Sequence, residues 1–293
     1  MKKTTSLYLV LAVTILIWGN SFVFVDMAIR DGSSPVMIAM ARFAVASSIF
    51  LAYMLIKKPN APDKQDRRLF FFLAFIGIGV YYIFQYYGVK FAGASVSSIL
   101  VTLLCPIVIF ILSVRRLGER VTTVQKLGLG ISATGSFFVV TDGTLSFISN
   151  SQAIIGGLFG IVCAILWAVY TVEGKRLVKK YDPVASTAYI TLIGTMMLVP
   201  FAAADTQVAG PAEFPLSFFM CALYLGVLCT VFGYVFWFRA LTGLDASTTG
   251  AALFFEPLVT IVFAWILLGE TIGWVAGFGG VLTMVGVVLV SRK

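Results

Sequence analysis

The chain has 293 residues, of which 60% are hydrophobic and only 12% are charged, and its formal net charge is +8. Soluble domains typically carry about 25% charged residues, so this composition, with a mean hydropathy of +1.00, excludes a soluble globular protein. Because the chain contains no histidine, it also excludes an imidazole base, a histidine-centred proton relay and a zinc site with histidine ligands.

Apolar stretches of roughly 20 residues recur along the chain, and each is long enough to cross about 30 Å of hydrocarbon. We predict an all-α integral membrane protein with ten transmembrane helices, at residues 7–27, 34–56, 69–88, 93–113, 121–140, 153–172, 184–203, 215–238, 246–268 and 271–290. The short connections leave no room for a soluble domain. The first stretch is too long for a signal peptide and lacks a small-residue cleavage site, so we expect it to remain as a helix.

The first two spans carry polar side chains near mid-depth, where burial in hydrocarbon is costly. In span 1, Trp18 and Asn20 lie at this depth, and the amide either lines a cavity or makes an interhelical hydrogen bond. In span 2, Arg42 lies near 12 Å from the outer end if each residue adds about 1.5 Å.

Span 3 carries Tyr82, Gln85 and Tyr86 on one helical face. Such a polar and aromatic face indicates a lumen-facing surface. The alternative is an outer interfacial belt, which fits Tyr86 better than Tyr82. Pro106 lies inside span 4, where a proline removes one backbone hydrogen bond and frees a carbonyl of the preceding turn.

Span 9 carries Glu256 near mid-depth, directly before Pro257. Glu256 and Arg42 can clamp the ammonium and carboxylate groups of a substrate, or neutralise each other in a structural ion pair. We predict a substrate cavity lined by Trp18, Asn20, Arg42, Tyr82, Gln85 and Glu256. We also predict that movement about Pro106 and Pro257 closes it alternately, static kinks being the alternative.

The remaining sequence features indicate no metal, no cofactor and no catalytic site. The four cysteines fall inside apolar spans without the spacing of metal ligands, so we expect them to be packing residues. They are Cys105, Cys163, Cys221 and Cys229. Glycines with small-xxx-small spacing favour close helix packing, but this spacing fits packing within one protomer and a dimer equally, so no oligomeric state is predicted.

Several features occur twice at nearly the same intervals, and the shared spacing predicts two homologous halves, residues 1–145 and 146–293. The repeated features are Trp18 and Trp167, Ala94-Ser95 and Ala246-Ser247, Pro106 and Pro257, and Leu117-Gly118-Glu119 and Leu268-Gly269-Glu270. Internal repeats in a very apolar chain are typical of membrane transporters, whose substrate site lies where the repeats meet.

The basic residues are distributed unevenly over the predicted loops. With both termini in the cytoplasm, 17 of the 21 basic residues fall on the cytoplasmic side, and the opposite loops hold only Arg30 and Lys90. This is the positive-inside rule of a multi-pass protein of the cytoplasmic membrane, so the net charge does not indicate a nucleic-acid partner. Five spans per half, an odd number, make the second half enter the membrane in the opposite sense, as in an inverted-topology repeat.

Several motifs together resemble the EamA-type branch of the drug/metabolite transporter (DMT) superfamily, over essentially the whole chain. They are Trp18-Gly19 with Ser21-Phe22, Arg42-Phe43, Ala246-Ser247, Glu256-Pro257 and Leu268-Gly269-Glu270. The resemblance implies a ten-helix inverted-repeat carrier with alternating access, export of small metabolites such as amino acids, and coupling to protons or exchange. The first half departs from the pattern, because Cys105 stands where the second half has Glu256.

We therefore predict a secondary transporter, not an enzyme, that exports a small polar or amino-acid-like metabolite. The alternatives are an uptake carrier for an aromatic or cofactor-like compound, which the tyrosines of span 3 would stack against, and a channel. If Glu256 carries a coupling proton, a substrate carboxylate that binds Arg42 would loosen an Arg42–Glu256 pair and make Glu256 easier to protonate.

Overall fold

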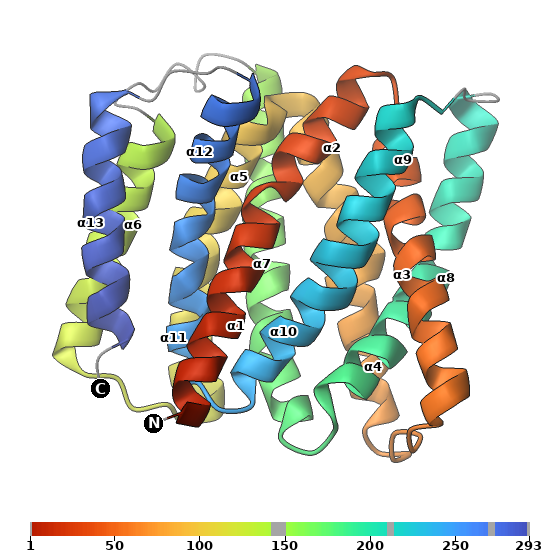
Figure 1. Ribbon diagram of the computed structural model, residues 1–293, viewed down its shortest axis with the longest axis horizontal. Helices are drawn as coiled ribbons and strands as arrows, with labels where there is room; N and C mark the ends of the chain where they lie inside the picture. Colours follow the sequence, from red (N-terminus) through yellow and green to blue (C-terminus); the bar gives the residue numbers. More distant parts are fainter. Residues whose placement is uncertain (1, 142–150, 210–213, 269–272, 292–293) are drawn as a thin grey trace.

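The computed structural model describes residues 2–141, 151–209, 214–268 and 273–291. Within these ranges it contains helices and no strand, which confirms the all-α prediction (Figure 1). The elements in chain order, with η for π- and 3-10 helices, are α1 (Lys2–Gly19), α2 (Ser21–Arg30), α3 (Pro35–Lys57), α4 (Arg67–Ala74), η1 (Phe75–Val80), α5 (Tyr81–Leu117), α6 (Thr123–Thr141), α7 (Ser151–Val178), α8 (Pro183–Ala209), α9 (Leu216–Leu223), η3 (Tyr224–Phe232), α10 (Gly233–Leu241), α11 (Ala246–Ala251), η4 (Ala252–Phe255), α12 (Glu256–Leu268) and α13 (Trp274–Ser291).

Eight helical stretches in the described part of the chain are long and apolar enough to cross a membrane, so this is a multi-pass membrane protein. They are Thr4–Arg30, Pro35–Lys57, Arg67–Ala92, Ile154–Val178, Pro183–Asp205, Leu216–Leu241, Ala246–Phe263 and Trp274–Ser291. The predicted spans 93–113 and 121–140 are not among the eight. The second of them corresponds to α6, whose first turn carries Gln125 and Lys126 and lowers its hydropathy. Ten spans therefore stays a prediction.

The helical assignment of α5 runs without a break where the sequence predicts two spans. Yet Tyr81, near its start, and Cys105 line one small cavity. In a straight helix, the residues between them would span about 36 Å at 1.5 Å per residue. The chain must therefore turn back between Gln85 and Val101, which line the same cavity from the two arms of α5.

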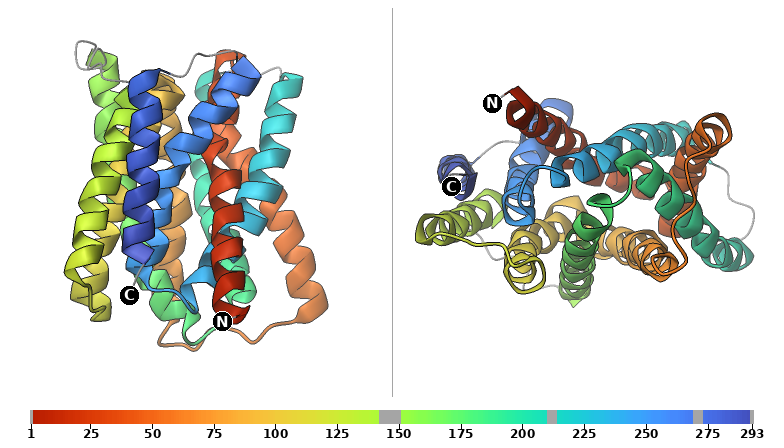
Figure 2. Two further views of the ribbon diagram at one scale, coloured as in Figure 1. Left: turned by 60° about the vertical axis from the view of Figure 1, so that its left-hand side comes forward. Right: turned by 90° about the horizontal axis from the view of Figure 1, so that it is seen from below.

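The helices form an elongated slab, with α6 and α13 at one narrow end and α3 and α8 at the other (Figures 1 and 2). Both chain termini lie at the same face of this slab, as do the connections α3–α4, α5–α6, α7–α8 and α10–α11 (Figure 1). We call this face the basic end, because its connections carry Lys58, Lys64, Arg120, Lys179 and Lys180. The cytoplasmic position of this end stays a prediction.

The two halves share an uncommon backbone feature. The π-helices η1 and η3 begin at Phe75 and Tyr224, and the difference of 149 positions (224 minus 75) equals that between Trp18 and Trp167 (167 minus 18). Because π-helical turns are rare in proteins, their occurrence at matched positions supports the internal repeat.

Side-chain burial is reversed relative to a soluble protein. Large apolar side chains such as Leu9, Leu55 and Met196 are 66–72% exposed on the outside, where they can contact lipid, whereas Arg42 and Glu256 are 3% and 7% exposed. The polar site predicted from the sequence therefore lies in the interior of the helix assembly.

Candidate functional site

A small central cavity brings together five of the six predicted site residues, namely Trp18, Arg42, Tyr82, Gln85 and Glu256. The complete lining is Trp18, Ser21, Phe22, Arg42, Tyr81, Tyr82, Gln85, Val101, Thr102, Cys105, Trp167, Leu253 and Glu256. These residues come from α1–α2, α3, both arms of α5, α7 and the η4–α12 junction, so both halves of the chain contribute to the cavity. Its volume is about 40 Å³, room for roughly three water molecules.

Arg42 is held in one orientation by three neighbours. Its Nε donates to Thr230 Oγ1 at 2.8 Å, and its Nη1 donates to the hydroxyl of Tyr86 at 3.0 Å. The guanidinium carbon lies 4.3 Å from the ring centroid of Tyr82, in cation–π distance. Tyr86 is 1% exposed, so the alternative that placed it in an outer aromatic belt is wrong for this residue.

Glu256 is the first residue of α12, directly after the 3-10 helix η4. Among the described residues, its carboxylate makes no ion pair, and neither does the guanidinium of Arg42. The structural ion pair that the sequence left open is therefore absent from this conformation. A buried guanidinium and a buried carboxyl group therefore line one cavity without pairing with each other.

Asn20 is the predicted residue that the structure does not place in the cavity. It interrupts span 1, between the end of α1 and the start of α2, and its Nδ2 turns back to Leu16 O at 3.3 Å. This break presents Ser21 and Phe22 to the cavity instead. The carbonyl of Gly19, freed at the break, accepts a hydrogen bond from the Thr260 hydroxyl at 2.5 Å, which satisfies it within the protein.

The two prolines occupy different helical contexts. Pro106 lies inside α5, as predicted, whereas Pro257 is the second residue of α12 and follows a 3-10 turn. Thr102 and Leu253 stand four residues before them, and both line the cavity. The 3-10 turn lets the Leu253 carbonyl accept from the N–H of Glu256. Movement about the prolines stays a prediction.

Aromatic rings form one wall of the cavity. The ring centroids of Trp18 and Trp167 lie 5.2 Å apart, edge to face, and Tyr81 packs against Trp167 at 5.4 Å. The indole of Trp18 donates to Cys229 O at 2.9 Å, and the hydroxyls of Tyr82 and Tyr234 are hydrogen-bonded to each other. Trp167 was not proposed for the site, although the repeat that pairs it with Trp18 could have identified it.

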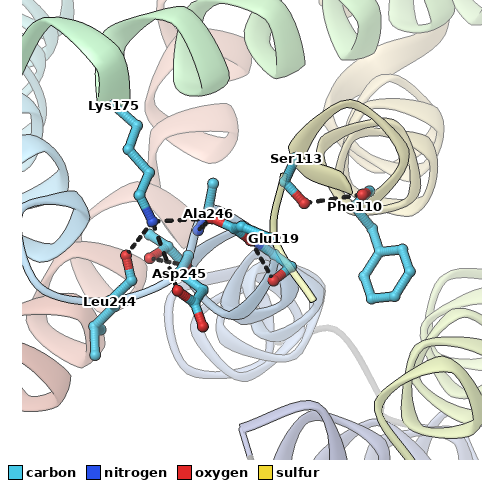
Figure 3. A network of polar contacts seen from close by, with 9 residues as sticks. Phe110, Ser113, Glu119, Lys175, Leu244, Asp245 and Ala246 are labelled. Carbon is cyan, nitrogen blue, oxygen red and sulfur yellow. Dashed lines mark hydrogen bonds and ion pairs between the residues drawn. The ribbon is translucent and has the colours of Figure 1, made fainter. Parts of the chain in front are cut away.

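A polar network joins the two halves at the basic end (Figure 3). Glu119, in the α5–α6 connection, accepts from the backbone N–H groups of Ala246 and Ser247 at 2.6 and 3.1 Å and from the Ser247 hydroxyl at 2.7 Å. Lys175 Nζ lies 2.9 Å from Glu119 Oε1 and donates to Leu244 O at 2.7 Å. Burial raises the pKa of Glu119, but the Ser247 hydrogen bonds and the Lys175 charge outweigh it and leave the pKa below its ordinary value.

A family model for EamA-like transporters matches the chain twice, over residues 5–141 and residues 154–292. The chain belongs to the EamA-like transporter family. This confirms the resemblance to the drug/metabolite transporter superfamily, and it makes the chain a transporter.

Two relatives of this EamA-like chain occur in Archaeoglobus fulgidus, and both are named uncharacterized transporters. One is 35% identical over 98% of this chain and 97% of its own, and the other is 32% identical over the full length of both. A protein of Streptantibioticus cattleyicolor named "Probable terminal-alkyne amino-acid exporter" is 26% identical over 97% of this chain and 92% of its own. A crystal structure with 17% identity matches 98% of both chains with a TM-score of 0.79 and shares the fold.

The site of this EamA-like transporter offers binding groups rather than a catalytic set. A guanidinium can bind a carboxylate with two hydrogen bonds, and a carboxylate can bind an ammonium group or a proton. The aromatic wall can pack against the apolar part of a small molecule. Sequence reasoning missed Thr230, and it placed Tyr86 on the lumen-facing side of span 3 without predicting its partner. Both side chains contact Arg42 and are not part of the cavity lining.

Proposed function

We propose that this chain is a secondary transporter that exports a small amino-acid-like zwitterion by alternating access. The observation that carries the proposal is that Arg42 and Glu256, a basic and an acidic side chain, are both buried, line one cavity and are not paired with each other. Unpaired charges inside a membrane protein are costly, and they mark ligand pathways. A zwitterion offers a partner to both charges at once.

The cavity volume supports alternating access. Sites for small molecules usually enclose about 300–1,000 Å³, whereas this cavity encloses about 40 Å³. The conformation is therefore closed around the site, and substrate entry requires the helices to move. We place this movement at Pro106 and Pro257, which lie next to the cavity in equivalent positions of the two halves.

The proposed orientation puts both termini and the basic end in the cytoplasm, with ten spans forming inverted repeats over residues 1–145 and 146–293. The basic residues at the end that holds the termini support this orientation. The S. cattleyicolor relative named "Probable terminal-alkyne amino-acid exporter" supports both the direction and the substrate class. Coupling to protons through Glu256, or exchange, would drive the transport.

Substrate binding can be tested by thermal shift of the purified full chain with the twenty proteinogenic L-amino acids. We expect at least one to raise the melting temperature, because selective binding to the folded state stabilises it. Arg42→Ala should reduce the rise in melting temperature caused by the amino acid more than the rise caused by its C-terminal amide, which lacks the carboxylate. A panel without any stabilising amino acid, or an Arg42→Ala variant that responds as the wild type does, would overturn the proposal.

An aromatic compound is a second candidate substrate, because Trp18, Tyr81, Tyr82 and Trp167 all line the cavity. Counterflow in proteoliposomes loaded with the stabilising compound separates these candidates and also separates a carrier from a channel. A carrier accelerates uptake when unlabelled substrate is present on the far side, and a channel does not.

A further inference from the structure

Thr230 connects Arg42 to a π-helical turn. The Thr230 side chain is fully buried, its hydroxyl accepts from Arg42 Nε at 2.8 Å, and it donates to the carbonyl of Leu225, five residues earlier, at 2.9 Å. The hydroxyl has a single proton, which goes to Leu225 O, so its oxygen can only accept from the guanidinium. The π-helix η3 brings the carbonyl five residues back within reach of this side chain.

Gly226 lets this turn lie directly against the backbone of Arg42. A Cβ atom at Gly226 would lie 2.8 Å from Arg42 O and 2.7 Å from Val45 Cβ, closer than side-chain carbons pack. Only glycine therefore allows η3 to approach α3 at this distance, which is the distance that Thr230 needs to reach Arg42 Nε.

The contacts with Thr230 and Tyr86 decide which edge of Arg42 remains for a ligand. A guanidinium has five N–H groups, and it binds both oxygens of a carboxylate either through the Nε/Nη2 edge or through the Nη1/Nη2 edge. Thr230 occupies Nε and therefore blocks the first edge. Tyr86 accepts from one of the two N–H groups of Nη1, so the second N–H of Nη1 and both N–H groups of Nη2 are left for the carboxylate. Tyr82 packs on the guanidinium face.

We propose that Thr230, set in place by the π-helical turn and Gly226, is a positioning residue that orients Arg42 so that its Nη1/Nη2 edge binds the substrate carboxylate. The inference rests on the proposed function of Arg42. Thr230 lies in the second half of the chain and Arg42 in the first, so the two halves build the carboxylate site together.

The test measures binding of the tightest-binding L-amino acid and of its C-terminal amide by thermal shift of the purified full chain. We expect Thr230→Val, which keeps the shape and removes the hydroxyl, to weaken binding of the amino acid about tenfold and to leave binding of the amide unchanged. Thr230→Ser keeps the hydroxyl and should restore binding. In counterflow, the same change should appear as a raised KM with an unchanged maximal rate.

Thr191→Val is the matched control, because Thr191 is equally buried and its hydroxyl has no partner among the described residues. Gly226→Ala is a second variant, and it should also weaken binding of the acid selectively. Two outcomes would overturn the positioning role and leave the proposed function intact. In one, Thr230→Val weakens binding of the amino acid and of its amide equally. In the other, Thr230→Val does not weaken binding at all, while Arg42→Ala no longer binds the amino acid. If Arg42→Ala itself binds as the wild type does, the proposed function fails, and the positioning role fails with it.

Discussion

At the scale of residues, the guanidinium of Arg42 is hydrogen-bonded by neutral side chains and is not paired with an acidic one. Thr230 and Tyr86 give Arg42 two hydrogen bonds, and Tyr82 gives it a ring face, yet none of the three carries a negative charge. In insertion experiments, an arginine at the centre of a membrane helix costs about 2.5–3.5 kcal/mol. Neutral hydrogen bonds lower this cost and leave the charge available to an anionic ligand.

A substitution at Glu256 tests whether this residue carries the coupling proton. Glu256→Gln keeps the shape of the side chain and removes both its charge and its ability to carry a proton. If Glu256 carries the coupling proton, we expect transport driven by a pH gradient in proteoliposomes to be lost, while counterflow exchange is retained. Glu173→Gln is the control, because Glu173 pairs with Arg176 at an exposed site near the basic end. Normal uphill transport by Glu256→Gln would contradict the coupling role.

The positions of the predicted site residues show which parts of the site can be predicted from a single sequence. Helical rise alone placed Arg42 and Glu256 near mid-depth, and both line the cavity, because distance along a helix translates directly into depth. Asn20 was placed at the same depth by the same argument, but the helix breaks at that residue and turns its amide back to Leu16. Tyr86 was predicted on the lumen-facing side of span 3, with a belt as the alternative, but its contact with Arg42 was not predicted. That contact depends on how two helices pack, which no local pattern encodes.

At the scale of elements, hydrogen bonds to the Glu119 carboxylate connect the α5–α6 connection to the start of α11. Its carboxylate satisfies two backbone N–H groups of the first turn of that helix, which have no partner within the helix itself. Lys175 reaches the same carboxylate from the end of α7. The first and second halves are thus joined at the basic end by a single side chain that makes several charge-assisted hydrogen bonds.

We expect Glu119→Gln to destabilise the fold by about 1–3 kcal/mol, because it removes a charged partner of buried groups. The folded-state pKa of Glu119 lies below its unfolded value of about 4.3. The contribution is therefore complete above the unfolded pKa and is lost as the pH falls through the folded pKa. Melting temperatures measured from pH 7 to pH 3 should differ most between wild type and variant at neutral pH. A difference that stays constant down to pH 3 would contradict this account.

At this scale too, the sequence predicted some features of the helices and not others. Runs of apolar residues predicted the bounds of α3, α6 and α13 within a few residues, because hydrocarbon thickness sets their length. The π-helices η1 and η3 lie within equally apolar sequence and gave no signal.

At the scale of the whole molecule, the basic end gathers the termini and four connections on one face (Figure 1). We expect a cysteine at Lys64 to be protected from a membrane-impermeant maleimide in intact cells and to react after the cells are opened. A cysteine at Asp31, in the α2–α3 turn at the opposite face, should react in intact cells. The four native cysteines are buried and give little background. Strong labelling of Lys64→Cys from outside would reverse the proposed orientation.

The family model matches the chain twice, and the π-helical turns lie at matched positions of the two halves, as we expect for a duplicated segment. The two copies have since diverged at the positions that matter most for charge. At the 149-residue interval of the π-helices, Arg42 corresponds to Thr191, and at the 151-residue interval of Pro106 and Pro257, Cys105 corresponds to Glu256. The guanidinium therefore comes from the first half and the carboxyl group from the second, so under the proposed function neither half alone could recognise both ends of a zwitterion. Joining the copies in one polypeptide allowed each to specialise, which two identical subunits encoded by one gene cannot do.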